Sequence, residues 1–230
     1  MSHVFSLQQA TVPIAGSQDL FPVRRIYCVG RNYAEHAKEM GFDARELPFF
    51  FCKPADAVVP VLPDTVGKVA FPSRTENLHH EIELVVAIGK GGGNIPVDQA
   101  NAHIFGYAVG LDMTRRDLQF AMRDKGRPWE IGKAFDQSAP IAPLHPLSQT
   151  GVLERGAIWL KVNGQERQHS DIARLIWSVP EVIANLSEYF ALAPGDLIFT
   201  GTPEGVGKVQ KGDTLSGGIA GLGELSIVLV

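Results

Sequence analysis

Cysteine is scarce in this 230-residue chain, which has only Cys28 and Cys52, each within an apolar run typical of a strand. We expect reduced core residues rather than a disulfide, as in a reducing compartment. Long hydrophobic runs are absent, and the N-terminus lacks the charged-then-apolar layout of a signal peptide. These absences argue against a transmembrane helix and make the cytoplasm the expected location.

Positive charge does not dominate either, because 21 lysines and arginines face 25 acidic residues and the formal net charge is -4. No basic surface for nucleic acid or anionic membrane is therefore expected. The chain also lacks a P-loop, a strand-linked G-x-G-x-x-G, a G-x-S-x-G elbow, an H-E-x-x-H motif and a zinc-type cysteine cluster. Dinucleotide enzymes, serine hydrolases and zinc proteases are thereby disfavoured.

Glycine and proline are plentiful, with 24 and 15 residues spread along the chain. This pattern indicates many short strands joined by tight turns. We predict a mainly β (α+β) catalytic domain over residues 23–230, with residues 1–22 as an N-terminal extension or edge strand. Strands are predicted over 25–30, 47–54, 81–89, 105–112, 157–162 and 197–200. Asn163-Gly164 predicts a hairpin turn.

Four short helices are also predicted, over residues 33–41, 96–103, 115–125 and from 179 onward. Thr114 with Asp117, and Ser178 with Glu181, have the spacing of capping boxes at the start of the last two. In the first helix, Glu39 follows His36 by three residues, so the two side chains are neighbours.

Two glutamates stand out in the strand predicted over 81–89. Glu81 and Glu83 would share one strand face, about 7 Å apart, and would repel each other unless a cation lay between them. Asp112 ends another predicted strand and supplies a third carboxylate. A solvated sheet face is the ordinary alternative for Glu81 and Glu83. Of the adjacent histidines, His80 is interpreted mainly as a strand residue.

Three carboxylates suit Mg²⁺ or Mn²⁺ and leave coordination positions for water and a chelating 2-oxo acid. The cationic candidates near such a site are Lys133 and Arg116, and Arg116 shares a helix face with Gln119. Arg116 could instead pair with Asp117 or Glu130. A non-enzymatic module with structural Ca²⁺ is a further alternative, in which six to eight oxygens surround the ion.

Six blocks of sequence resemble the fumarylacetoacetate hydrolase family, within it the acylpyruvase and fumarylpyruvate hydrolase members. They occur in the family's order, from about Ile26 to the C-terminus. The blocks cover residues 29–36, 51–54, 79–84, 106–117, 125–136 and 200–207.

The resemblance implies a mixed β-roll, a homodimer, and Mg²⁺ or Mn²⁺ held by Glu81, Glu83 and Asp112. It also implies a catalytic His36 and Glu39 pair on a mobile lid helix. The remaining site residues that it implies are Lys133 beside the substrate and Arg116, Gln119 and Thr202 on substrate oxygens.

The implied reaction is hydrolysis of the carbon–carbon bond of a 2,4-dioxo acid to a carboxylic acid and pyruvate, in the catabolism of aromatic compounds. Fumarylpyruvate is the first choice of substrate, with Arg31, Arg116 and Arg127 as candidate partners of its second carboxylate. Decarboxylation of oxaloacetate or of a ring-cleavage diacid, and isomerisation of 2-oxo diacids, are the alternatives that keep the same metal site.

Overall fold

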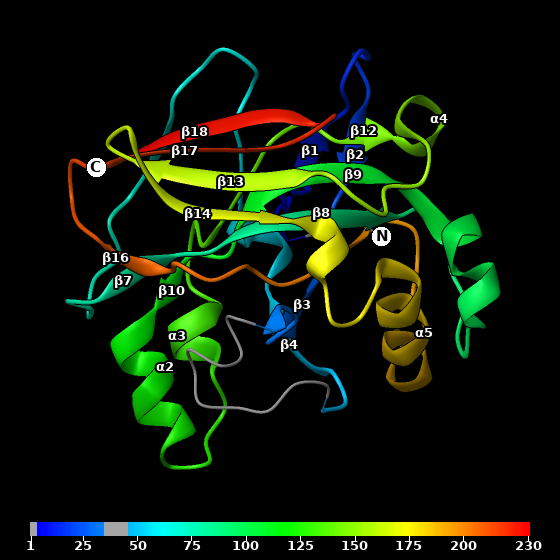
Figure 1. Ribbon diagram of the computed structural model, residues 1–230, viewed down its shortest axis with the longest axis horizontal. Helices are drawn as coiled ribbons and strands as arrows, with labels where there is room; N and C mark the ends of the chain where they lie inside the picture. The colour runs from blue at the N-terminus through cyan, green and yellow to red at the C-terminus, as the bar shows by residue number, and fades with distance from the viewer. Residues whose placement is uncertain (1–3, 35–45) are drawn as a thin grey trace.

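The computed structural model describes residues 4–34 and 46–230, and these are dominated by β-strands (Figure 1). The largest sheet has the order β4-β3-β15-β8-β9-β11-β5, with β12 paired to β9. It is mixed, because β15 runs parallel to β3 and β11 runs parallel to β5. Its strands are β3 (Arg25–Gly30), β4 (Phe49–Lys53), β5 (Val58–Pro60), β8 (Ile82–Ile88), β9 (Ile104–Leu111), β11 (Ala139–Ile141), β12 (His145–Pro146) and β15 (Asp196–Phe199).

A second sheet of five strands has the order β14-β13-β17-β18-β6, and it lies across β8 and β9 (Figure 1). The buried side chains of Leu84, Val109, Leu160 and Ile227 belong to the core cluster that joins the two sheets. The five strands are β6 (Gly67–Val69), β13 (Ala157–Val162), β14 (Gln165–Asp171), β17 (Thr214–Ile219) and β18 (Gly223–Leu229).

The hairpin predicted at Asn163-Gly164 is confirmed, because it joins β13 to β14. Both turn residues have positive φ, 50° and 79°, as this kind of two-residue turn requires. The mainly β fold class is therefore confirmed.

A third sheet is small and has the order β10-β7-β16, formed by β7 (Leu78–His80), β10 (Thr114–Arg115) and β16 (Gly207–Val209). The strand predicted from residue 81 begins instead at Ile82. Glu81 lies in the break between β7 and β8, which belong to different sheets. Asp112 occupies the matching break between β9 and β10, and its N–H donates to the carbonyl of Glu81 at 2.9 Å.

Among the described residues the α-helices are short: α2 (Arg116–Arg123), α3 (Glu130–Lys133), α4 (Leu147–Thr150) and α5 (Val179–Tyr189). The 3₁₀-helices are η1 (Ala55–Ala57), η2 (Val97–His103) and η3 (Ile172–Arg174). The capping box of Ser178 and Glu181 is confirmed at the start of α5. No helix in the described part of the chain is long and apolar enough to span a membrane.

The capping box predicted for Thr114 and Asp117 is wrong. Thr114 lies in β10 and its hydroxyl donates to the carbonyl of Asp112 at 3.1 Å. Asp117 accepts instead from the Thr75 hydroxyl at 2.6 Å and from the Glu76 N–H at 2.9 Å. The carboxylate therefore ties the first turn of α2 to the segment before β7. Most of the helix predicted over 33–41 falls outside the described residues.

The N-terminal strands β1 (Thr11–Pro13) and β2 (Leu20–Pro22) form a hairpin. Val12 and Phe21 are buried in a second core cluster that also contains Cys28. Residues 11–22 thus pack on the large sheet, and the domain division at residue 22 stays a prediction. Cys28 is a buried free thiol as expected, but Cys52 is exposed, because it lies on the edge strand β4.

Candidate metal centre and active site

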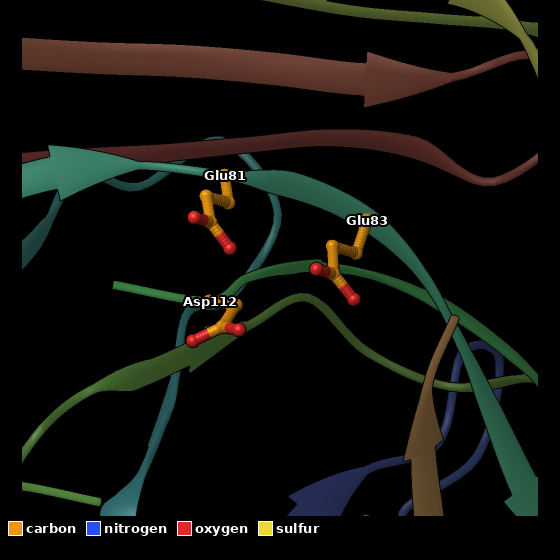
Figure 2. A group of neighbouring side chains, drawn as sticks. All are labelled: Glu81, Glu83 and Asp112. Atoms are coloured by element: carbon orange, nitrogen blue, oxygen red, sulfur yellow. The ribbon is translucent and has the colours of Figure 1, made fainter. Parts of the chain in front are cut away.

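Three carboxylates converge where the large and small sheets meet (Figure 2). Glu81 comes from the break after β7, Glu83 from β8 and Asp112 from the break after β9. Each of them offers an oxygen such that the three atoms lie within 4.8 Å of one another. All three residues are buried, with exposed fractions of 4%, 2% and 1%. The solvated sheet face considered for the glutamates is therefore excluded.

Three buried cations surround these carboxylates. Lys133 Nζ lies 2.7 Å from Glu81 Oε2 and 2.7 Å from Asp112 Oδ2. Arg116 forms an ion pair with Glu81, and Lys53 Nζ lies 2.9 Å from Asp112 Oδ1. Burial of a single unpaired charge would be very costly, so the carboxylates depend on this compensation.

Glu83 differs from the other two carboxylates in its partners. Its Oε2 accepts the N–H of Gly201 at 2.8 Å. Burial raises the pKa of Glu83 well above its usual range, and the neighbouring charges of Asp112 and Glu81 raise it further. For Lys133, burial lowers the pKa, but Asp112 and Glu81 outweigh it and raise the pKa overall. Lys133 is thus held as a cation.

The donor set fits a hard divalent cation. Three carboxylates at this separation offer the all-oxygen ligands that Mg²⁺ and Mn²⁺ prefer. Asp112 Oδ1 has no hydrogen-bond partner within residues 4–34 and 46–230, although Lys53 neutralises its charge. The pKa of Glu83 is raised by burial first and by the charges of Asp112 and Glu81 second, and a cation between the carboxylates would offset both effects.

The two histidines before Glu81 have other partners. The Nδ1 of His80 lies 2.9 Å from the Oε1 of Gln168. His79 lies between Asn77 and Arg116, with ring nitrogens at 3.0 and 3.4 Å from their side chains. Burial, followed by the charge of Arg116, lowers the pKa of His79 to about 4. Both rings are therefore engaged with neighbouring side chains and belong to the support of the carboxylates.

The three carboxylates line one pocket. The structure brings to this pocket eight of the ten residues predicted for the site, namely Arg31, Glu81, Glu83, Asp112, Arg116, Gln119, Lys133 and Thr202. The other two, His36 and Glu39, lie outside the described residues. Arg127 is exposed and is not among the residues that line the pocket.

Arg116 and Thr202, both predicted to bind substrate oxygens, also contact other residues of the protein. Arg116 Nη1 donates to Gln119 Oε1 at 2.5 Å, in addition to its ion pair with Glu81. The hydroxyl of Thr202 donates to the carbonyl of Ile82 at 2.8 Å. Both side chains therefore support the Glu81–Glu83 segment from within the protein.

An aromatic wall closes the pocket, formed by Phe49, Phe51 and Trp129. The ring of Trp129 meets Phe49 edge-on, with ring centres 5.3 Å apart. The guanidinium of Arg31 lies over the Phe49 ring at 5.3 Å. Arg31 has a positive φ of 59°, an uncommon conformation for a residue with a side chain. Positive charge and apolar surface thus meet at the wall.

Sequence reasoning gave no role to Lys53, to Gln168 or to the aromatic wall. A signal existed for Lys53, since a lysine in a strongly apolar strand has to be paired if that strand is buried. Phe49 and Phe51 were expected only as strand residues. For Gln168 there was no local signal, because its strand is polar throughout.

A cluster of buried carboxylates that lines a pocket is typical of a metal-dependent enzyme. The pattern of the fumarylacetoacetate (FAA) hydrolase C-terminal family matches residues 25–230, and the chain belongs to that family. The fumarylpyruvate hydrolase of a Ralstonia species is 50% identical over 184 residues, which are 80% of this chain and 93% of that protein. The mouse mitochondrial oxaloacetate tautomerase FAHD1 is 41% identical over 199 residues, 86% of this chain and 88% of that protein.

Among solved structures, the fumarylpyruvate hydrolase of Pseudomonas aeruginosa in complex with Mn²⁺ and pyruvate is 62% identical to this chain. The TM-score is 0.98, and the match covers all of this chain and 99% of that one. The match therefore includes the segments that carry the three carboxylates.

Proposed function

We propose that this protein is a metal-dependent hydrolase of acylpyruvates, with fumarylpyruvate as its substrate. The buried cluster of Glu81, Glu83 and Asp112, facing a pocket with Lys133, is the observation that carries the proposal. Its support from relatives is the 62% identity to a fumarylpyruvate hydrolase that binds Mn²⁺ and pyruvate.

Glu81, Glu83 and Asp112 would hold the divalent ion. When bound, Mg²⁺ or Mn²⁺ supplies positive charge beside the 2-oxo acid end of the substrate, where negative charge develops. Glu81 and Asp112 form ion pairs with Lys133, Arg116 and Lys53, and these cations balance the negative charge of the two carboxylates.

The reaction adds water to the C4 carbonyl and breaks the bond between C3 and C4. The acyl part leaves as a carboxylic acid, and the electron pair of the broken bond remains as the enolate of pyruvate. That enolate is then protonated at C3. Lys133 is held as a cation in the pocket and would stabilise the enolate charge electrostatically.

We assign the proton transfer to His36, oriented and made more basic by Glu39. His36 would take a proton from the attacking water and so make the water a better nucleophile. Both residues lie outside the described part of the chain, and their sequence spacing and the family block support this assignment. The segment that carries them leads from Arg31 at the pocket back to Phe49 in its wall.

The charge balance of the pocket favours a substrate with two carboxylates. Three carboxylates face Lys133, Arg116 and Lys53, so a bound divalent ion leaves about two positive charges in excess, and Arg31 at the pocket adds a third. Fumarylpyruvate brings two negative charges, whereas acetylpyruvate brings one. Arg31 beside Phe49 is the residue to which we assign the second carboxylate, with the fumaryl chain against the aromatic wall.

A spectrophotometric assay tests the activity. The purified protein with Mn²⁺ should cleave fumarylpyruvate with a higher kcat/KM than acetylpyruvate, and oxaloacetate should be the poorest substrate. The variants His36→Ala and Glu83→Gln should both abolish cleavage. Decarboxylation needs no attacking water, so His36→Ala should leave any activity on oxaloacetate unchanged. Full cleavage of acylpyruvates by His36→Ala would contradict the mechanism.

The variant Arg31→Gln tests the substrate assignment separately. Loss of a charge-assisted contact to the second carboxylate should lower kcat/KM for fumarylpyruvate by about 10- to 100-fold. Cleavage of acetylpyruvate, which lacks that carboxylate, is the internal control and should change much less. An equal loss for both substrates would remove Arg31 from this role.

We also propose that the protein is a homodimer in the cytoplasm. Support comes from β4 at the edge of the large sheet, where Phe50 is only partly buried and Cys52 is exposed. An exposed edge strand with apolar side chains is a surface on which another chain can pair or pack. Light scattering after size exclusion should give about twice the chain mass of 24.9 kDa, and a monomer would refute the dimer.

A further inference from the structure

One buried amide behind the metal centre uses all of its hydrogen-bonding capacity. Gln168 on β14 is 1% exposed, although β14 is polar along its length. Its Oε1 accepts from the N–H of Ile82 at 3.2 Å and lies 2.9 Å from His80 Nδ1. Its Nε2 donates to Thr202 Oγ1 at 2.8 Å and to the carbonyl of Pro203 at 2.8 Å.

The direction of every bond in this network is fixed by backbone groups. Ile82 N–H can only donate and the Pro203 carbonyl can only accept, so the amide of Gln168 has a single consistent orientation. His80 must therefore donate from Nδ1. Thr202 accepts from Gln168 and uses its one hydrogen on the carbonyl of Ile82. Gln168 and Thr202 thus form a closed ring of hydrogen bonds with the N–H and the carbonyl of Ile82.

These hydrogen bonds take the place of the ladder that β15 would form with Ile82 if β15 were longer. On that side, β15 pairs with β8 only as far as Phe199 opposite Val85, so Ile82 lies beyond its reach. Thr202 and Gln168 satisfy both backbone groups of Ile82 instead. Ile82 separates Glu81 from Glu83, and the orientation of its backbone therefore decides where the two carboxylates point.

We propose that Gln168 is a positioning residue for the metal site and acts through Ile82 and Thr202. It holds the Glu81–Glu83 segment in the spacing that the divalent ion requires. Thr202 has the same role, and its hydroxyl binds the backbone carbonyl of Ile82 rather than a substrate oxygen. The inference rests on the metal-binding part of the proposed function and does not depend on which acid is cleaved.

Calorimetric titration of the metal-free protein with Mn²⁺ tests this. The variant Gln168→Met removes all four bonds at nearly constant volume and should weaken Mn²⁺ binding by about tenfold or more, as loss of an outer-sphere partner commonly does. Gln165→Met makes the same replacement at an exposed position of the same strand and should stay within about twofold.

A second pair of variants separates positioning from mere stability. Thr202→Val removes the hydroxyl and should weaken Mn²⁺ binding, whereas Thr202→Ser retains the hydroxyl and should restore most of the affinity. The double variant of Gln168→Met and Thr202→Val should weaken binding less than the product of the single effects, because both act on Ile82.

Circular dichroism melting of the metal-free variants shows whether each remains folded. If Gln168→Met does not fold, the Thr202 pair decides the question by itself. Folded variants of Gln168 and Thr202 that bind Mn²⁺ like the wild type would overturn the inference. Wild-type protein that binds Mn²⁺ but cleaves no acylpyruvate would refute the proposed function and leave this inference standing.

Discussion

The two buried lysines of the site share Asp112 as a partner but differ in their other contacts. Lys133 Nζ contacts the carboxylates of Glu81 and Asp112. Lys53 Nζ also donates to two backbone carbonyls, those of Met113 at 3.3 Å and of Lys133. Lys53 thus holds the chain on both sides of the pocket, and its charge offsets that of Asp112. Lys133 lines the pocket, whereas Lys53 links the backbone segments of Met113 and Lys133.

Lys53→Met should therefore be a stability variant. The change removes the Lys53 donor from the buried carbonyls of Met113 and Lys133, of which the second keeps the Ser138 hydroxyl as a donor, and it takes one cation from Asp112. Breaking a buried pair in this way costs about 3 kcal/mol in the free energy of unfolding. Urea unfolding of metal-free protein measures it, with Lys208→Met on the exposed surface as the matched control. Equal stability of the two variants would contradict the assigned role.

At this scale, residues that carry chemistry were easier to predict from sequence than residues that support them. The spacing of Glu81 and Glu83 suggested a cation site beside the alternative of a solvated sheet face, and the family resemblance implied the ligand set with Asp112. Gln168 was beyond reach, because its burial results from β14 packing behind residues far away in the sequence. Thr202 was predicted as a site residue and lines the pocket, but the acceptor of its hydroxyl is Ile82, a contact that no motif specifies.

At the scale of elements, the site depends on two interruptions in neighbouring extended segments, which lie opposite each other. β7 and β8 separate at Glu81, and β9 and β10 separate at Asp112. The sequence indicates strands β8 and β9, since one apolar and β-branched run begins just after Glu81 and another ends at Asp112. It does not indicate that the pairs change sheets there, because a sheet change is decided by pairing partners elsewhere in the chain.

Close packing of α2 on α3 positions two pocket residues, Gln119 and Lys133. Gly132 lies at the contact, where a Cβ would come within 2.8 Å of the backbone N of Gln119. Gly132→Ala should therefore push the helices apart and displace both pocket side chains. Overpacking of this kind costs roughly 1–3 kcal/mol, and we expect a clear drop in kcat with the substrate for which the wild type is most active.

The matched control for that variant is Gly93→Ala. At Gly93 the nearest atom to an added Cβ is the carbonyl oxygen of Ser187 at 3.8 Å, which is an ordinary contact. Gly93→Ala should thus keep wild-type stability and kcat. If Gly132→Ala is equally active and equally stable, the close contact between α2 and α3 does not position the pocket.

For the whole molecule, the net charge of -4 gives no hint of the balanced charges in the pocket. The carboxylates lie where the large sheet, the small sheet and the five-stranded sheet come together, since β7 and β8 join two of them and Gln168 reaches in from the third. Unfolding of any one sheet would separate these groups. A metal ion held by them therefore stabilises the entire fold and not a local loop.

Metal should consequently raise the melting temperature of the whole protein. At a free Mn²⁺ concentration of about 100 times its Kd, binding to the folded state alone adds about 2.7 kcal/mol. For a chain of this size, that corresponds to a rise in Tm of about 5–10 °C. Glu83→Gln should show a much smaller rise, each protein being compared with and without Mn²⁺ at constant ionic strength. An equal rise in both proteins would place the ion elsewhere, and no rise in the wild type would exclude a metal site at these carboxylates.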